Sequence, residues 1–264
     1  MRKALISFVA ALFLTAHARA GGEMEYREGG IIRGPTEKRE IALEFTGDQF
    51  VEGGPVILDQ LARHRIKASF FLTGRCLRKA ENRALIRRII DEGHYLGPHS
   101  DSHPLLCSWE APKKTLVSRE FFLSDMGRNL EAIETLGAPR AAARYFIAPY
   151  EWYNAEIAAW AAEMGLVVVN FTPGTRSTAD YTESGATNYA SSQEILESIE
   201  GRERQAGAAG WLLLLHLGAG PGRADKMHDR LGELIGYFQG RGYQFVRIDQ
   251  MAAPKPAARE SKVK

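Results

Sequence analysis

Two histidines four residues apart, His99 and His103, are the clearest candidates for chemistry in this sequence. They belong to the segment HSDSH, which directly follows a short apolar run. A spacing of four places two imidazoles on one side of a helical turn. Two neutral imidazoles and one carboxylate, with a position left open for water, describe a catalytic zinc-type site. The pair is therefore predicted to bind a metal, the alternative being two unrelated surface or core histidines.

A third histidine, His216, ends a run of four leucines in the segment LLLLH. A histidine changes its charge near neutral pH, which suits it to donate or accept a proton. At the end of a buried strand, His216 is a candidate acid or base. The alternative is a core histidine that is bonded to a backbone carbonyl.

Apolar runs of strand length alternate with amphipathic segments of helical spacing through most of the chain. The strands contain continuous apolar residues, which indicates that protein covers both faces of the sheet. This alternation predicts an α/β fold with a mostly parallel sheet, whose sites lie at the carboxyl ends of strands. The expected strands are Ile41–Thr46, Ala68–Thr73, Tyr95–His99, Arg144–Ala148, Leu166–Phe171, Trp211–His216 and Tyr243–Ile248. The expected helices are Pro55–Arg63, Arg83–Glu92, Ser118–Leu136, Asn154–Met164, Ser191–Arg204 and Ala224–Gln239.

The amino-terminal segment 1–20 is typical of a secretory signal peptide. It has a basic start, an apolar stretch of about 11 residues and the small-x-small pattern Ala18-Arg19-Ala20. The stretch is well short of the roughly 20 residues that a spanning helix needs, so we expect export without stable membrane insertion. Removal of Arg2, Lys3 and Arg19 would change the net charge from +2 to −1. Such a balanced chain is a poor candidate for binding nucleic acid.

Four motifs of this chain, taken in order, resemble the polysaccharide deacetylase family, also called the NodB homology or carbohydrate esterase 4 group. The resemblance covers about Glu40–Asp249. It implies a distorted (β/α)7 barrel, a divalent metal that is usually zinc, and hydrolysis of acetyl groups on polymeric sugars. It also implies that His216 is the general acid, that Asp180 orients it, and that the backbone N–H of Tyr150 holds the oxyanion. The motifs are HSDSH at 99–103, RYFIAPY at 144–150, FTPGTRSTADY at 171–181 and LLLLH at 212–216.

The first motif departs from the family pattern T-F-D-D, in which the first Asp is the base and the second a metal ligand. This chain reads EFTGD, with Thr46 and Gly47 in those two places. The Arg that partners the base in the family is also replaced, by Ile147. We expect Asp48 to take the third metal position beside the two histidines, since a carboxylate suits a hard or borderline cation. The alternative is that Asp48 caps the following loop.

The sequence offers three candidates for the general base. Glu151 stands where the family usually has Gly, directly after Tyr150, and is our candidate catalytic base. Glu44 shares the strand-face parity of position 46 and is a second candidate. Asp101, inside HSDSH, is a third, although an Asp in a turn more often stabilises the turn.

The expected substrate is an acetylated polysaccharide or oligosaccharide of the cell envelope or the extracellular space. Trp152, Tyr153 and Tyr181 are candidates for stacking on sugar rings, with ordinary packing as the alternative. The predicted domains are the signal peptide 1–20, a deacetylase-like catalytic domain 21–252 that acts as a monomer, and a disordered tail 253–264. Cys76 and Cys107 allow either a disulfide or two buried thiols in an exported protein.

Two other functions remain possible from the sequence. The altered first motif is compatible with a carbohydrate-binding protein that has a degenerate deacetylase fold and little turnover. A related metal amidase that acts on a small substrate is the other possibility, and a closed pocket would favour it over an open groove.

Overall fold

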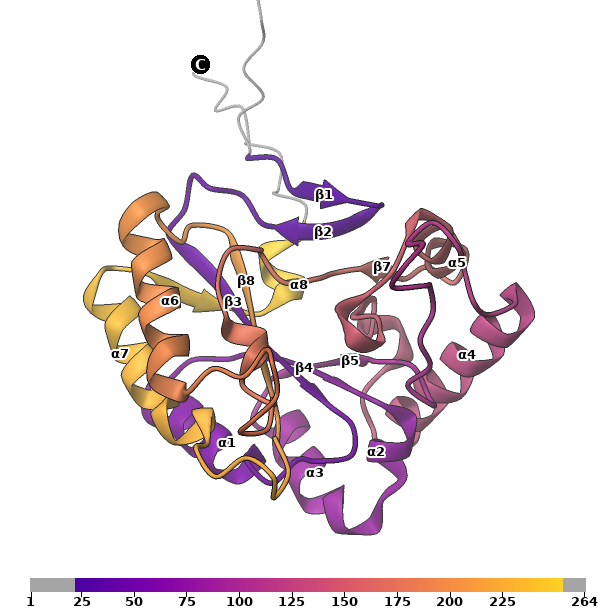
Figure 1. Ribbon diagram of the computed structural model, residues 1–264. Coiled ribbons are helices and arrows are strands. Elements are labelled where there is room, and N and C mark those ends of the chain that lie inside the picture. Colours follow the sequence, from indigo (N-terminus) through magenta and orange to yellow (C-terminus); the bar gives the residue numbers. More distant parts are fainter. Residues whose placement is uncertain (1–21, 254–264) are drawn as a thin grey trace, which may run out of the picture.

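The computed structural model describes residues 22–253, and the chain in this range folds into strands surrounded by helices (Figure 1). The predicted signal peptide, and the predicted tail beyond residue 253, lie outside the described residues. The strands are β1 (Glu25–Arg27), β2 (Gly30–Arg33), β3 (Glu40–Gly47), β4 (Ser69–Leu72), β5 (Tyr95–Pro98), β6 (Tyr145–Phe146), β7 (Val167–Val168), β8 (Trp211–His216) and β9 (Gln244–Val246). The helices are α1 (Gly54–Arg63), α2 (Gly74–Arg78), α3 (Arg83–Asp91), α4 (Arg119–Thr135), α5 (Ala155–Glu163), α6 (Ser192–Ala206), α7 (Leu231–Gly240) and α8 (Ile248–Met251).

The strands form an irregular closed ring, as the predicted distorted barrel requires. The main sheet has the order β1-β2-β8-β3-β4-β5, and β6 pairs with β7 in parallel. A hydrogen bond from the Ile147 amide to the Pro98 carbonyl (3.4 Å) joins β5 to the β6 segment. A parallel bridge between Ile31 and Val169 joins β2 to the segment after β7. The distortion therefore lies in β6 and β7, which are short and attached to their neighbours by few hydrogen bonds.

The hairpin β1–β2 was not predicted from the sequence. Its turn is Glu28-Gly29, and both residues have positive φ angles, 47° and 83°. That backbone suits a two-residue hairpin turn. The strand β2 runs antiparallel to β8 and occupies the gap between β7 and β8, where the repeat pattern predicted only parallel neighbours.

Local signals in the sequence explain most helix boundaries. The predicted cap Ser118 accepts a hydrogen bond from the Phe121 amide (3.1 Å), and Asn154 caps α5 in the same way. Gly137 and Gly165 follow the ends of α4 and α5 with φ angles of 96° and 74°, which glycine adopts at low cost.

Several predicted boundaries differ from the structure. The predicted strands Arg144–Ala148 and Leu166–Phe171 shorten to the two-residue strands β6 and β7. The last long helix begins at Leu231, because residues Met227–Arg230 form a separate 3-10 turn. The last strand ends at Val246, and Ile248 starts the short helix α8. The strand β9 pairs with the first residues of β3, and β4 pairs with the last four residues of β3. The strand β9 therefore shares one edge of β3 with β4 and is not a separate full-length strand of the ring.

The two faces of β3 show how the sheet separates the core from the site. Ile41, Leu43 and Phe45 pack against the helices in the larger core cluster. The residues between them, Ala42, Glu44 and Thr46, have the opposite parity, and Ala42 packs inside the ring. The polar residues Glu44 and Thr46 therefore share the inner face of β3 and follow one another toward the carboxyl ends of the strands. None of the helices within residues 22–253 has the length and apolar character needed to cross a membrane.

Candidate active site

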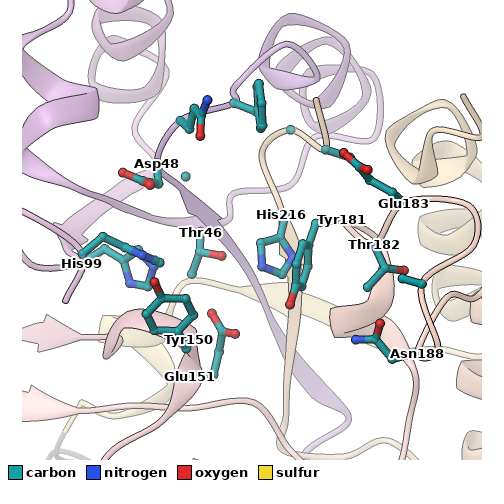
Figure 2. A pocket seen from close by; sticks show the side chains of 17 residues that line it. Thr46, Asp48, His99, Tyr150, Glu151, Tyr181, Thr182, Glu183, Asn188 and His216 are labelled. Atoms are coloured by element: carbon teal, nitrogen blue, oxygen red, sulfur yellow. The ribbon is translucent and has the colours of Figure 1, made fainter. Parts of the chain in front are cut away.

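The candidate site is a cavity of about 490 Å³ at the carboxyl ends of β3, β5 and β8 (Figure 2). Six predicted site residues and the stacking candidate Tyr181 line it; the six are Asp48, His99, His103, Tyr150, Glu151 and His216. Trp152 lines a neighbouring cavity that shares Glu151. The topology thus brings together residues from five separate segments of the chain.

His99 follows β5 and is fixed by contacts from both sides. Its backbone amide donates to the Asn129 side chain of α4 (2.9 Å). Its Nδ1 lies 2.8 Å from the carbonyl oxygen of Ile147, to which an Nδ1–H donates. This bond leaves Nε2 with its lone pair, as a metal ligand requires. Burial, together with the nearby His103, lowers the pKa of His99 to about 3, so the ring stays neutral.

His103 is held by a strained turn. Ser100 and His103 have φ angles of 66° and 57°, and the Ser100 hydroxyl accepts a hydrogen bond from the His103 amide (2.9 Å). The buried Asp125 of α4 accepts the Asp101 amide (2.7 Å) and the Ser102 hydroxyl (2.6 Å). The rings of His99 and His103 are 5.0 Å apart between centroids. Burial lowers the pKa of His103, so a second neutral imidazole faces the cavity.

Asp48 follows β3 and lies on the same side of the cavity as His99 (Figure 2). Burial alone would raise the pKa of its carboxyl, but hydrogen bonds from Arg75 and Thr73 and the nearby His103 hold the pKa below its usual value. The Arg75 guanidinium donates to both carboxylate oxygens, with Nε 2.5 Å from Oδ1. The carboxylate is therefore ionised and paired with a cation of the protein itself.

The donor set of two neutral imidazoles and one carboxylate fits a divalent cation such as zinc in its chemistry. The geometry brings two of the three predicted ligands together and leaves Asp48 bound to Arg75. Across residues 22–253, no three His, Cys, Asp or Glu side chains are grouped closely enough to hold a metal ion. The metal site thus stays a prediction whose third ligand must move.

His216 ends β8 on the opposite side of the cavity and is paired with Asp180. Oδ1 of Asp180 lies 2.6 Å from the His216 Nδ1, and its Oδ2 accepts the His216 amide (2.7 Å). Burial alone would lower the pKa of His216, but the charges of Asp180 and Glu151 raise it above its usual value. The ring is therefore easier to protonate than that of an ordinary histidine, and its Nδ1–H is bonded to Asp180. Of the predicted pairs, this one matches the expectation most closely.

Glu151 lies between Tyr150 and His216 in the view of Figure 2, below Thr46. Tyr150 and Glu151 are consecutive residues with φ angles of 61° and 53°, a left-handed conformation that is costly for both. The Asn170 side chain donates to the Glu151 carbonyl (2.7 Å) and helps to fix this conformation. Burial raises the pKa of the Glu151 carboxyl, and the nearby His216 opposes that rise.

The other two base candidates lie elsewhere. Glu44 is fully buried inside the ring, and neither of its carboxyl oxygens has a hydrogen-bond partner among residues 22–253. Burial raises its pKa to about 8, and Glu44 does not line the cavity. Asp101 is bound by Arg78 (2.6 Å) and Arg128 (3.2 Å), away from the cavity, in a structural role.

The predicted aromatic residues have different environments. Tyr181 is half-exposed, and its ring lies 4.4 Å from that of His216. The ring of Trp152 lies 5.1 Å from that of the exposed Trp109, tilted by 31°, and its indole N–H donates to the Ser108 carbonyl. Tyr153 is buried and donates to the Arg27 carbonyl, so it belongs to the packing.

Cys76 and Cys107 are both free and buried, which settles the cysteine alternatives in favour of thiols.

Arg75, Trp109 and Asn129 were not among the residues predicted to form the site. Arg75 stands just past a strand end, in the segment FFLTGR, and that position was a usable signal. Trp109 and Asn129 carry no such signal, because their role depends on which loops and helices the fold brings to the site.

A family model described as polysaccharide deacetylase matches residues 33–169, which is more than half of the chain. The chain belongs to the polysaccharide deacetylase family. The peptidoglycan-N-acetylglucosamine deacetylase of Bacillus cereus is 27% identical over 218 residues, which cover 83% of this chain and 70% of the relative. The chitooligosaccharide deacetylase of a Bradyrhizobium species is 29% identical, over 75% of this chain and 83% of the relative.

The crystal structure of a peptidoglycan N-acetylglucosamine deacetylase in complex with a benzamide compound superimposes with a TM-score of 0.68. It is 25% identical and covers 83% of this polysaccharide deacetylase family member and 91% of the solved chain. The distorted barrel predicted from the motifs is confirmed by this similarity. The family match, which ends at residue 169, does not include Asp180 or His216.

Proposed function

We propose that this protein is a metal-dependent hydrolase that removes N- or O-acetyl groups from a cell-envelope or extracellular polysaccharide. Family membership and the relatives named as peptidoglycan and chitooligosaccharide deacetylases support this function. The observation that carries it is the Asp180–His216 pair facing the His99–His103 pair across one cavity. This arrangement places a proton donor opposite two metal-type ligands.

His216 would act as the general acid. With Nδ1–H bonded to Asp180, its Nε2 is free to donate a proton to the leaving nitrogen of an amide or the leaving oxygen of an ester. The raised pKa of His216 extends the pH range over which the ring holds that proton. Asp180 would hold the tautomer and stabilise the imidazolium without reacting itself.

Glu151 would act as the general base and take a proton from the attacking water. The family base position holds Thr46, whose side chain cannot accept a proton at neutral pH, and Glu151 is the carboxylate that lines the cavity next to His216. Oxygen of the water bonds to the acetyl carbon, its proton passes to Glu151, and the bond to the sugar nitrogen or oxygen breaks as His216 protonates it. Acetate is the product in either case.

His99, His103 and Asp48 are the residues that would hold a divalent cation, with zinc the expected ion. The chemistry that such a cation supplies is Lewis acidity, which lowers the pKa of water and polarises a carbonyl. The backbone N–H of Tyr150 would stabilise the developing oxyanion, as the family resemblance implies. Tyr181 and Trp152, with the neighbouring Trp109, would contact sugar rings of an extracellular glycan bound by a monomer.

Acetate release tests this function directly. The full exported chain would be incubated with acetylated peptidoglycan fragments and chitooligosaccharides, with and without added Zn²⁺. We expect Zn²⁺-dependent acetate release that His103→Ala abolishes. Release of no acetate from any acetylated glycan would contradict the proposal.

A second candidate function is carbohydrate binding with little turnover. It is favoured by Thr46 and Gly47 in the first motif and by the diversion of Asp48 to Arg75. Glycan binding that persists without acetate release, in the presence of Zn²⁺, would select this alternative.

A further inference from the structure

The contact between Asp48 and Arg75 joins the ends of two neighbouring strands. Asp48 comes directly after β3, and Arg75 lies in the first turn of α2, just after β4. The two strands pair in parallel up to Gly47 and Leu72, which brings the two residues together. The Thr73 hydroxyl also donates to Oδ1 of Asp48 (2.8 Å), so this carboxylate has three donors from the β4–α2 segment.

The Arg75 guanidinium occupies the Asp48 carboxylate as a bound metal cation would. The guanidinium fork binds both oxygens at once, and such bidentate pairs are among the stronger and more directional ion pairs. The Asp48 side chain is only 18% exposed, while that of Arg75 is 51% exposed. The ion pair can therefore open by movement of Arg75 toward solvent, while Asp48 stays at the cavity wall.

A divalent cation and a guanidinium repel each other, so both cannot share one carboxylate in a tight geometry. Any cation bound by His99 and His103 would thus meet Arg75 at its third ligand.

We propose that Arg75 competes with the divalent cation for Asp48, so that the metal site is completed only when the Asp48–Arg75 ion pair opens. This inference rests on the metal dependence in the proposed function and adds a gate to it. Arg75 is a positioning residue, because it acts through Asp48. The consequence is a site with a lower cation affinity than its three ligands would otherwise provide.

The test is a Zn²⁺ titration of the chelator-stripped full exported chain, using competition with a chromophoric chelator. We expect Arg75→Gln to tighten Zn²⁺ binding about two- to fivefold, the range of a partly exposed ion pair that must be broken. Arg87→Gln removes the same charge from an exposed position of α3 and should leave the affinity unchanged. Cobalt(II) absorption bands would report in parallel whether an oxygen ligand joins the two imidazoles.

A double-mutant cycle separates competition for Asp48 from general electrostatic repulsion. In an Asp48→Asn background, Arg75→Gln should no longer change the Zn²⁺ affinity. Equal tightening in both backgrounds, or no tightening in the native background, would overturn the inference while leaving metal-dependent deacetylation intact. If neither the native chain nor Arg75→Gln binds Zn²⁺, the metal dependence fails and the gate fails with it.

Discussion

The two sides of the cavity are built differently. On one side, Asp180 bonds both the ring and the backbone amide of His216. On the other side, His99 and His103 face each other, and Asp48 is paired with Arg75. We refer to these as the acid side (Asp180, His216) and the imidazole-pair side (Asp48, Arg75, His99, His103). The acid side is assembled by hydrogen bonds within the chain itself. On the imidazole-pair side the two rings already face each other, but the Asp48 carboxylate is bound to Arg75 and not to the histidine pair. The difference indicates that proton donation is preorganised, whereas cation binding requires a rearrangement.

The largest expected effect is on the acid side. His216→Ala should lower the kcat of acetate release about 10³-fold, within the range of general acid–base contributions, with little change in KM. His64→Ala, at the end of α1 and outside the cavity, is the matched control. If His216→Ala keeps more than a tenth of the native kcat, the proton comes from another group and the acid side loses its assigned role.

Glu151→Gln should lower kcat about 10²-fold, as expected for loss of a general base. Because burial raises the pKa of Glu151, the native activity should increase with pH through a range above that of an ordinary glutamate. The variant should lose this acidic limb of the pH–rate profile. Glu183→Gln, at an exposed position of the same cavity, should retain it. An unchanged acidic limb in Glu151→Gln would show that Glu151 is not the base.

Glu44 lies beneath both sides and should affect stability more than catalysis. Its folded-state pKa is raised from 4.5 to about 8, so above pH 4.5 the unfolded chain loses a proton that the folded chain retains. The folded state is therefore penalised increasingly as the pH rises, by about 3 kcal/mol at pH 7. Glu44→Gln should remove this penalty, giving a more stable protein at pH 7 and little change at pH 4. Urea unfolding at both pH values, with Glu40→Gln at the base of the same strand as control, measures the difference.

The smallest expected effect is a difference in histidine titration between the two sides, which proton NMR of the cation-free protein would measure. His99, with a pKa lowered to about 3 by burial, should not titrate between pH 5 and 8. His216 should titrate above the usual histidine range, and Asp180→Asn should lower its pKa. The pair then stabilises the fold below the unfolded-state pKa, and this stabilisation is lost as the pH rises through the folded-state value. A His99 that titrates near 6.5 would show that the two sides are less different than proposed.

Sequence reasoning was strongest where a function depends on local spacing. HSDSH and LLLLH identify His99, His103 and His216 because each motif sits at a strand end, and both strands appear where predicted. Asp180 followed from its place in a family motif, although 36 residues separate it from His216.

Features that depend on neighbours across the fold were not predictable in the same way. Arg75 meets Asp48 only because β3 and β4 are adjacent and in register. The β1–β2 hairpin has no helix after it, so the β/α repeat gave no reason to expect an extra strand beside β8. Trp109 reaches Trp152 and Tyr150 from a loop without regular structure.

The left-handed backbone at Tyr150 and Glu151 has a consequence for the evolution of this protein in the laboratory. Glycine adopts a φ of 53° with less strain than glutamate does, so Glu151→Gly would relieve a local cost of about 1 kcal/mol. A library selected for heat tolerance alone would thus tend to enrich that variant. The same selection would discard the carboxylate, so thermal fitness and turnover would diverge at a single codon.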